Sequence, residues 1–62
     1  MQTKFMNHAK YQQKLRTLDV SALHFIIKDA SEAASANPNN PNVGYYLDEV
    51  SYAGMELRRR GV

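Results

Sequence analysis

The feature that most constrains this chain is one cluster of helix-breaking residues just past its middle. Residues 37–42 read Asn-Pro-Asn-Asn-Pro-Asn and contain both prolines of the chain. Proline removes a backbone donor and disfavours helix in the residue before it, so this cluster separates two helical segments. Because so short a linker makes its flanking helices antiparallel neighbours, the sequence predicts a helical hairpin.

Residues 20–36, before the linker, have apolar side chains at the spacing of one helical face. Asp19 is expected to cap the free amides at the start of this helix. Leu18 and Leu23 stand at the spacing of a hydrophobic staple. The apolar positions are Leu23, Ile26, Ile27, Ala30, Ala33 and Ala34.

Residues 41–60, after the linker, repeat this helical spacing. We expect Asn40 to cap this helix, with Pro41 in its first position and Gly61 just beyond its end. The apolar positions are Val43, Tyr46, Leu47, Val50, Ala53, Gly54 and Leu57.

Antiparallel pairing of the two helices places large residues opposite small ones. Alanine and glycine are expected to let the two backbones approach closely and form a dense core. The predicted layers are Ala34 with Tyr46, Ala30 with Val50, Ile27 with Ala53, and Leu23 with Leu57.

The N-terminal segment has a thinner, partly polar stripe, which predicts a helix over about 4–16, with Thr3 as its cap. Alternatively, this helix frays or runs into the next one through a kink at 17–19. The expected fold is therefore an all-α three-helix bundle in a single domain, 1–62: a hairpin of 20–36 and 41–60 with the N-terminal helix packed across it. The N-terminal stripe comprises Phe5, His8, Tyr11 or Gln12, Leu15 and Leu18.

The chain has no recognisable chemical site. It contains no cysteine, and its two histidines, His8 and His24, lack partners at metal-ligand spacing. Ser21 shares a helical face with His24, but no third group orients the pair. The neighbouring carboxylates of Asp48 and Glu49 diverge by about 100° on a helix. We expect no enzyme activity, no metal, no cofactor and no small-molecule substrate.

Size and hydropathy indicate where the protein is expected to reside and whether it is expected to self-associate. The longest apolar run is 25–27, too short to cross a membrane, and residues 1–8 lack the apolar core of a signal peptide. We therefore expect a cytoplasmic protein without membrane association. A chain of 62 residues hides only about 60% of its unfolded surface, which favours self-association, with a homodimer as the default form.

Two surfaces are candidates for binding a macromolecule. Aromatic and methionine side chains lie off the core face of their helices, where they would contact a protein partner unless the N-terminal helix covers them. Basic residues are expected to gather at one pole, where they would contact phosphates of a nucleic acid. Alternatively, the last arginines complement the helix dipole, with Glu56 available to Arg59 or Arg60. The first set is Tyr45, Tyr52, Met55 and Phe25, and the second is Lys10, Lys14, Arg16, Arg58, Arg59 and Arg60.

The linker and the helix after it resemble the junction between tetratricopeptide repeats. That family, however, has a bulky aromatic residue where Gly44 stands and a small residue where Asp48 stands. A repeat array also requires about three repeats, and only one junction is present. The chain therefore departs from that family.

A broader resemblance covers residues 17–60. The runs 27–30, 32–33 and 44–49, together with Tyr52 and residues 56–59, resemble small helical proteins of unassigned role encoded by tailed bacteriophages. The resemblance implies a setting and assigns no residue a role. We expect a non-catalytic protein-binding module, in that setting an early protein that inhibits or redirects a host factor. The alternatives are a small nucleic-acid-binding protein and a structural or assembly protein.

Overall fold

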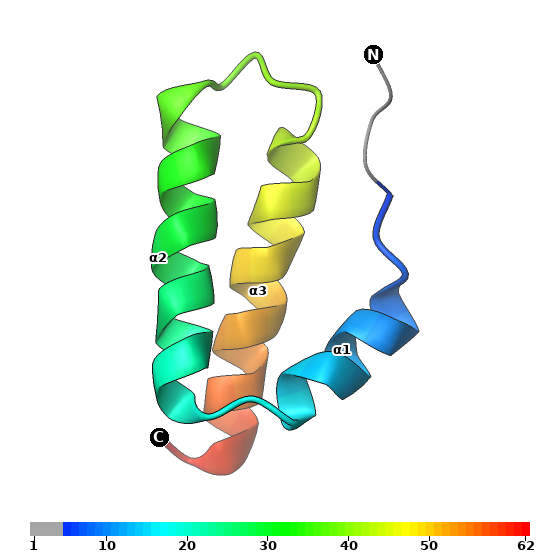
Figure 1. Cartoon of the computed structure of the whole chain (residues 1–62), viewed down its shortest axis with the longest axis vertical. Coiled ribbons are helices and arrows are strands. Elements are labelled where there is room, and N and C mark those ends of the chain that lie inside the picture. Colours follow the sequence, from blue (N-terminus) through cyan, green and yellow to red (C-terminus); the bar gives the residue numbers. More distant parts are fainter. Residues whose placement is uncertain (1–4) are drawn as a thin grey trace.

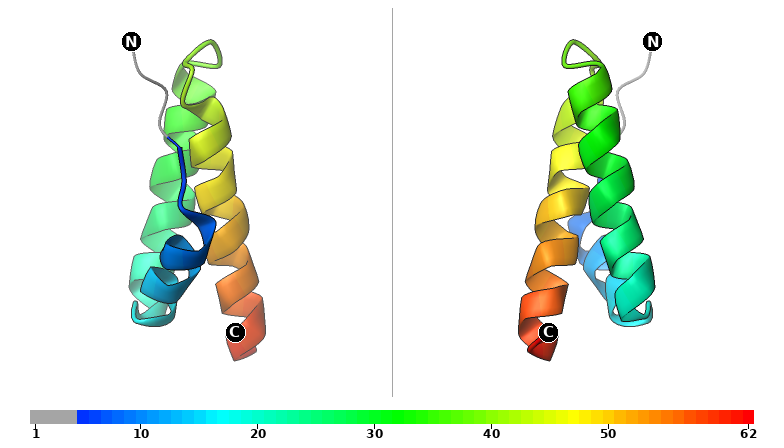
Figure 2. Two further views of the ribbon diagram at one scale, coloured as in Figure 1. Left: turned by 90° about the vertical axis from the view of Figure 1, so that its right-hand side faces the viewer. Right: turned by 90° about the vertical axis from the view of Figure 1, so that its left-hand side faces the viewer.

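The computed structural model describes residues 5–62, which form three helices: α1 (His8–Arg16), α2 (Val20–Ala36) and α3 (Val43–Arg60). Helices α2 and α3 lie side by side and antiparallel, and the linker joins them at one end (Figure 1). Helix α1 crosses the hairpin obliquely near its other end and packs against α3 (Figure 2). The predicted all-α bundle is confirmed.

Helix α1 begins later than the sequence analysis predicted. Asn7 has extended backbone angles, and its side chain accepts a hydrogen bond from the amide of Lys10 at 3.2 Å. Because asparagine is a strong N-cap, this bond sets the first turn at His8 rather than near residue 4. Phe5 therefore precedes the helix and is 89% exposed. The proposed cap Thr3 lies outside the described residues.

A break at residues 17–19 separates α1 from α2. The hydroxyl of Thr17 donates to the carbonyl of Lys14 at 2.7 Å, at the end of α1. The carboxylate of Asp19 accepts from the amide of Ala22 at 2.8 Å, which confirms the predicted cap of α2. Leu18, between them, packs against the core cluster that contains Leu23. The two helices are therefore distinct.

The predicted start of α3 is wrong by two residues. The side chain of Asn40 accepts from the amide of Asn42 at 2.8 Å, and its carbonyl accepts from Val43 at 3.0 Å. An asparagine side chain bonded two residues on forms a turn, so Asn40 ends the linker instead of capping a helix. Pro41 lies in this turn, and Asn42 occupies the cap position without a side-chain cap bond.

The core lies where the three helices meet, at the end of the hairpin that α1 crosses. Of the two α1 candidates, Tyr11 is buried and Gln12 is exposed. The predicted layers Leu23 with Leu57 and Ile27 with Ala53 contribute to this cluster. Nearer the linker, Ala30 is buried, whereas the residues around it are only partly buried. The buried cluster comprises Tyr11, Leu15, Leu23, Ala53 and Leu57.

Among residues 5–62, no helix combines the length and apolar character that a bilayer span requires.

The close approach of the two helix backbones that we expected at Gly54 is absent. A Cβ atom placed on Gly54 would meet nothing within 4 Å, whereas its neighbour Ala53 is fully buried. The buried core therefore makes use of the small side chain of Ala53, whereas it does not require the missing side chain of Gly54. Gly61 has a structural requirement, since its φ of 79° ends α3 in the left-handed region.

We predict that Gly54→Ala stabilises the protein by about 1 kcal/mol, since alanine restricts the unfolded chain and favours helix. The same change at Gly61 is expected to destabilise by about 1 kcal/mol, because alanine disfavours a positive φ. Thermal unfolding followed by circular dichroism would resolve both, since 1 kcal/mol shifts the Tm of so small a domain by about 4–8 °C. A lower Tm for Gly54→Ala would contradict the structure.

Candidate functional site

A groove of about 260 Å³ lies between α1 and the last two turns of α3. Helix α3 contributes residues at positions i, i+3, i+4 and i+7, which share one helical face. We call this hollow the α1–α3 groove. Its lining residues are Gln12, Leu15 and Arg16 from α1, and Tyr52, Met55, Glu56 and Arg59 from α3.

The floor of the α1–α3 groove is apolar, and part of it faces solvent. Leu15 is buried in the core, Tyr52 is half-buried, and Met55 is 56% exposed. A large apolar side chain with more than half its surface exposed is available to a partner.

Helix α1 is fixed on α3 by two tyrosines. The hydroxyl of Tyr52 and Nδ1 of His8 share a hydrogen bond of 2.8 Å, and their rings lie 5.6 Å apart. The hydroxyl of Tyr11 donates to the carboxylate of Glu49 at 2.9 Å. Burial, the bond to Glu49 and the charge of that carboxylate all raise the pKa of Tyr11, so the hydroxyl keeps its proton. Tyr52 is thus partly covered by α1.

One wall of the groove is built on the buried carboxylate of Glu56, which is 7% exposed. It accepts bonds from Nε and Nη2 of Arg59 at 2.9 and 2.7 Å, and from Nε of Arg60 at 2.7 Å. The bonds from Arg59 and then Arg60 lower the pKa of Glu56 to about 2 against the opposing effect of burial. Both pairings that the sequence spacing allowed are therefore present together.

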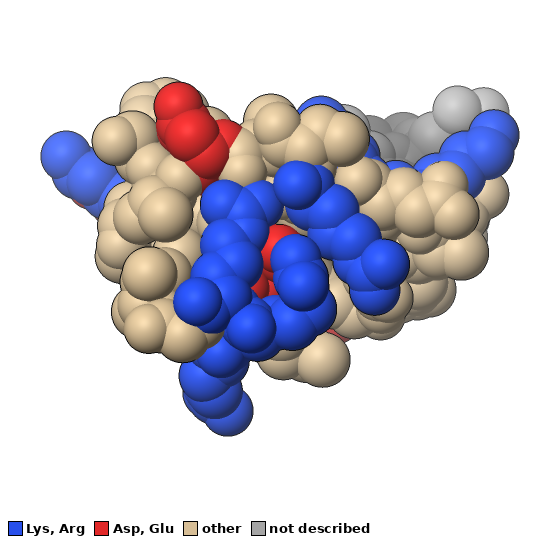
Figure 3. All heavy atoms as spheres, turned by 90° about the horizontal axis from the view of Figure 1, so that it is seen from below, with Lys and Arg blue, Asp and Glu red and all other residues tan. Residues whose placement is uncertain are grey.

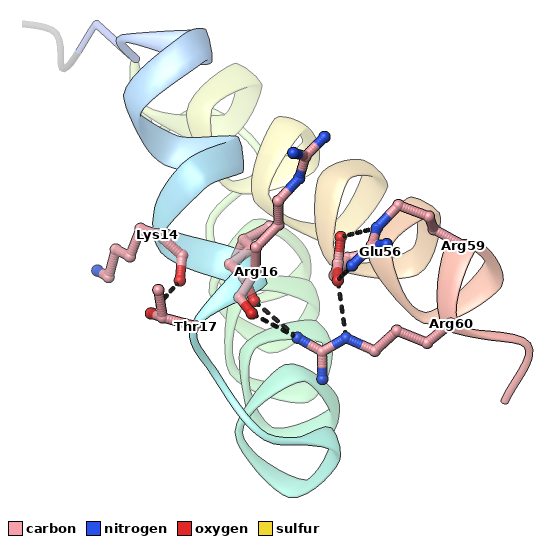
Figure 4. A network of polar contacts seen from close by, with 7 residues as sticks. Lys14, Arg16, Thr17, Glu56, Arg59 and Arg60 are labelled. Atoms are coloured by element: carbon pink, nitrogen blue, oxygen red, sulfur yellow. Dashed lines mark hydrogen bonds and ion pairs between the residues drawn. The ribbon is translucent and has the colours of Figure 1, made fainter.

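Arg60 also joins α3 to the end of α1. Its Nη2 donates to the carbonyls of Leu15 at 3.0 Å and Arg16 at 3.3 Å (Figure 4). The last carbonyls of a helix have no partner within the helix, so a side chain from elsewhere can satisfy them. We call this chain of bonds, from Glu56 through Arg60 to α1, the arginine clamp.

The structure divides the predicted basic residues. Arg16 and Arg59 line the α1–α3 groove. In contrast, Lys10 and Lys14 line a second hollow, of about 210 Å³, and Lys14 points away from the clamp (Figure 4). Arg58 is exposed. Basic side chains nevertheless crowd the end of the molecule around a small acidic patch (Figure 3).

The predicted aromatic set is divided as well. Tyr52 and Met55 meet in the α1–α3 groove, whereas Tyr45 lines the second hollow. Phe25 is 66% exposed, and its position two residues after Leu23 turns it by about 200° from the core. These four residues therefore do not form one continuous surface.

The sequence analysis assigned three residues that line the groove to neither candidate binding set: Gln12, Leu15 and Glu56. The spacing of Tyr52, Glu56 and Arg59 along α3 is a signal that could have placed Glu56 on this face. The contribution of Gln12 and Leu15 depends on how α1 docks, for which the local pattern has no signal.

Ser21 and His24 are both exposed on α2, and the Glu56 oxygens are occupied by arginine N–H groups. Within residues 5–62 no three histidine, aspartate or glutamate side chains converge to hold a metal ion.

No protein family, curated protein or solved structure matches this chain.

We predict that Glu56→Gln lowers the Tm at neutral pH and flattens its acid dependence. Since the folded pKa of Glu56 lies below its ordinary value of about 4.3, ionised Glu56 stabilises the fold above that value. This stabilisation disappears as the pH falls toward about 2.

Thermal unfolding across this pH range would test the prediction. The control is Asp48→Asn, which removes an exposed carboxylate of the same helix and should keep the acid-side decline of the wild type. An equal decline in wild type and Glu56→Gln would refute the assigned role of Glu56.

Proposed function

We propose that this chain is a non-catalytic protein-binding module that contacts its partner through the α1–α3 groove. The observation that carries this proposal is the exposed apolar floor at Met55, framed by tyrosine and arginine. Tyrosine, methionine and arginine are the residue types enriched in protein interfaces.

The size of the groove also favours a protein partner. Pockets for small molecules usually hold about 300–1,000 Å³, and the α1–α3 groove is smaller, at about 260 Å³. It is open to solvent between two helices, which suits a side chain that projects from a larger surface.

The setting of this binding is a further part of the proposal. The resemblance of residues 17–60 to small bacteriophage proteins supports a bacterial host protein as partner, with binding in the host cytoplasm. A second copy of the chain is the competing occupant, because small domains gain stability by association.

We expect tagged wild-type protein to capture a stoichiometric partner from bacterial lysate. Met55→Ser should reduce that capture at least about tenfold, since a loss of about 1.4 kcal/mol in binding free energy weakens affinity by a factor of ten. Phe25→Ser is the matched control, because it makes the same kind of polar change at an exposed apolar residue outside the groove.

Failure of the wild type to retain any partner would contradict the proposal, as would equal loss of the partner in both variants. Light scattering of the purified wild type separates self-association from binding to another protein.

Nucleic-acid binding is the second candidate, favoured by the crowding of basic side chains at one end of the molecule (Figure 3). Arg16 and Arg58 form no ion pair among the described residues. Both are therefore available for phosphates, whereas Glu56 partly neutralises Arg59 and Arg60.

If this candidate holds, changing both Arg16 and Arg58 to alanine should weaken binding to DNA or RNA. The slope of log K against log salt should become shallower by about 0.9 for each phosphate that the variant no longer neutralises. Changing both Lys10 and Lys14 to alanine is the control, because these residues line the other hollow. Unaltered mobility of both nucleic acids with wild-type protein at low salt would eliminate this candidate.

A further inference from the structure

The α1–α3 groove places positive charge on both sides of its apolar floor. Arg16 belongs to α1 and Arg59 to α3, so the two side chains flank the floor from different helices. The side chain of Arg16 extends into the space between the two helices (Figure 4). A ligand that fills this groove therefore meets apolar atoms in the middle and guanidinium groups at the sides.

Arg59 is held in place yet keeps donors for a ligand. Glu56 engages its Nε and Nη2, which leaves Nη1 outside this pair. The Arg59 side chain is 55% exposed. Because Glu56 already restricts the guanidinium, a ligand would lose less side-chain entropy on binding it.

The charge of this end of the molecule remains positive. Four arginines, from α1 and the last turn of α3, accompany two acidic side chains at this end, the buried Glu56 and the exposed Asp19 that caps α2. Carboxylates of a partner would find complementary charge here, and arginine presents parallel donors that match the two oxygens of a carboxylate.

We infer that the α1–α3 groove binds an acidic segment of a partner protein, in which one bulky apolar side chain rests on Tyr52 and Met55 while neighbouring carboxylates pair with Arg16 and Arg59. This inference rests on the proposed protein-binding function and names the chemistry of the partner. A nucleic-acid backbone offers phosphates, but its sugar carbons lie among ether and ester oxygens and form no bulky apolar side chain for the exposed floor at Met55. A protein segment with such a side chain therefore uses both parts of the groove.

A short synthetic peptide tests this assignment directly. The probe is a fluorescein-labelled peptide with a single leucine between glutamates, and its affinity is measured by fluorescence anisotropy. One analogue replaces the leucine by serine, and another replaces the glutamates by lysines. We expect the first peptide to bind and each analogue to bind at least about tenfold more weakly, since both the anchor and the charges contribute. Higher salt should weaken the binding as well.

Amide chemical shifts of the labelled protein locate the peptide. We expect changes at residues of the groove, and none that saturate at the outer face of α2 around Phe25. Preferential shifts outside the groove would overturn the inference.

Charge reversal at Arg16 provides a matched comparison. Arg16→Glu and Lys28→Glu change the net charge equally, but Lys28 is exposed on α2 and lines neither hollow. We expect Arg16→Glu to weaken the peptide at least about tenfold and Lys28→Glu to change it less than about twofold. Arg16→Gln, which removes the charge without adding an opposite one, should weaken the peptide in the same direction. Circular dichroism establishes that each variant is folded.

The outcomes separate this inference from the proposed function. If wild type captures a protein through Met55 but the acidic peptide does not bind, the partner chemistry is wrong and the protein-binding proposal stands. If an oligonucleotide shifts the groove amides and the peptide does not, the inference is overturned in favour of nucleic acid. Equal effects of Arg16→Glu and Lys28→Glu would also overturn it, because binding would then follow net charge alone.

Discussion

The rest of the molecule depends on how one buried carboxylate is satisfied. Glu56 sits beside the apolar core and stays ionised because two arginines donate to it. A charge removed from water is tolerated only when it is paired and hydrogen-bonded. Arg60 connects this carboxylate to another helix, since its guanidinium also donates to the last carbonyls of α1. The clamp therefore links the end of α3 to the end of α1.

The apolar core and the arginine clamp occupy the same end of the hairpin. Tyr11 and Leu15 from α1 bury against Leu23 and Leu57, while Arg60 bonds the carbonyl of Leu15. Toward the linker the two long helices face each other without α1, and the residues around Ala30 are only partly buried. Stability and the candidate binding surface thus draw on the same contacts.

Local signals in the sequence were sufficient for the hairpin. The linker prolines separate the two helices and Asp19 caps α2, as predicted, and both signals act within a few residues. Pro41, however, lies in the turn before α3 and not in its first helical position. The errors arose where two local signals competed. Asn7 started α1 later than expected, and Asn40 formed a turn that displaced the start of α3.

The candidate site depended on contacts that no local pattern contains. The spacing of Glu56, Arg59 and Arg60 predicted the ion pairs within α3. Their connection to Leu15, across 45 positions of sequence, arises only once α1 has docked. The division of the aromatic and basic residues between two hollows follows from the same docking.

Helix α1 contains nine residues, too few for a helix to persist in water without tertiary contacts. One wall of the groove therefore exists only while α1 is docked, so local opening of this segment removes the proposed binding surface. Any occupant that touches both walls gains affinity only from the docked state and draws the equilibrium toward it. The proposed recognition and the ordering of α1 would thus form one coupled equilibrium.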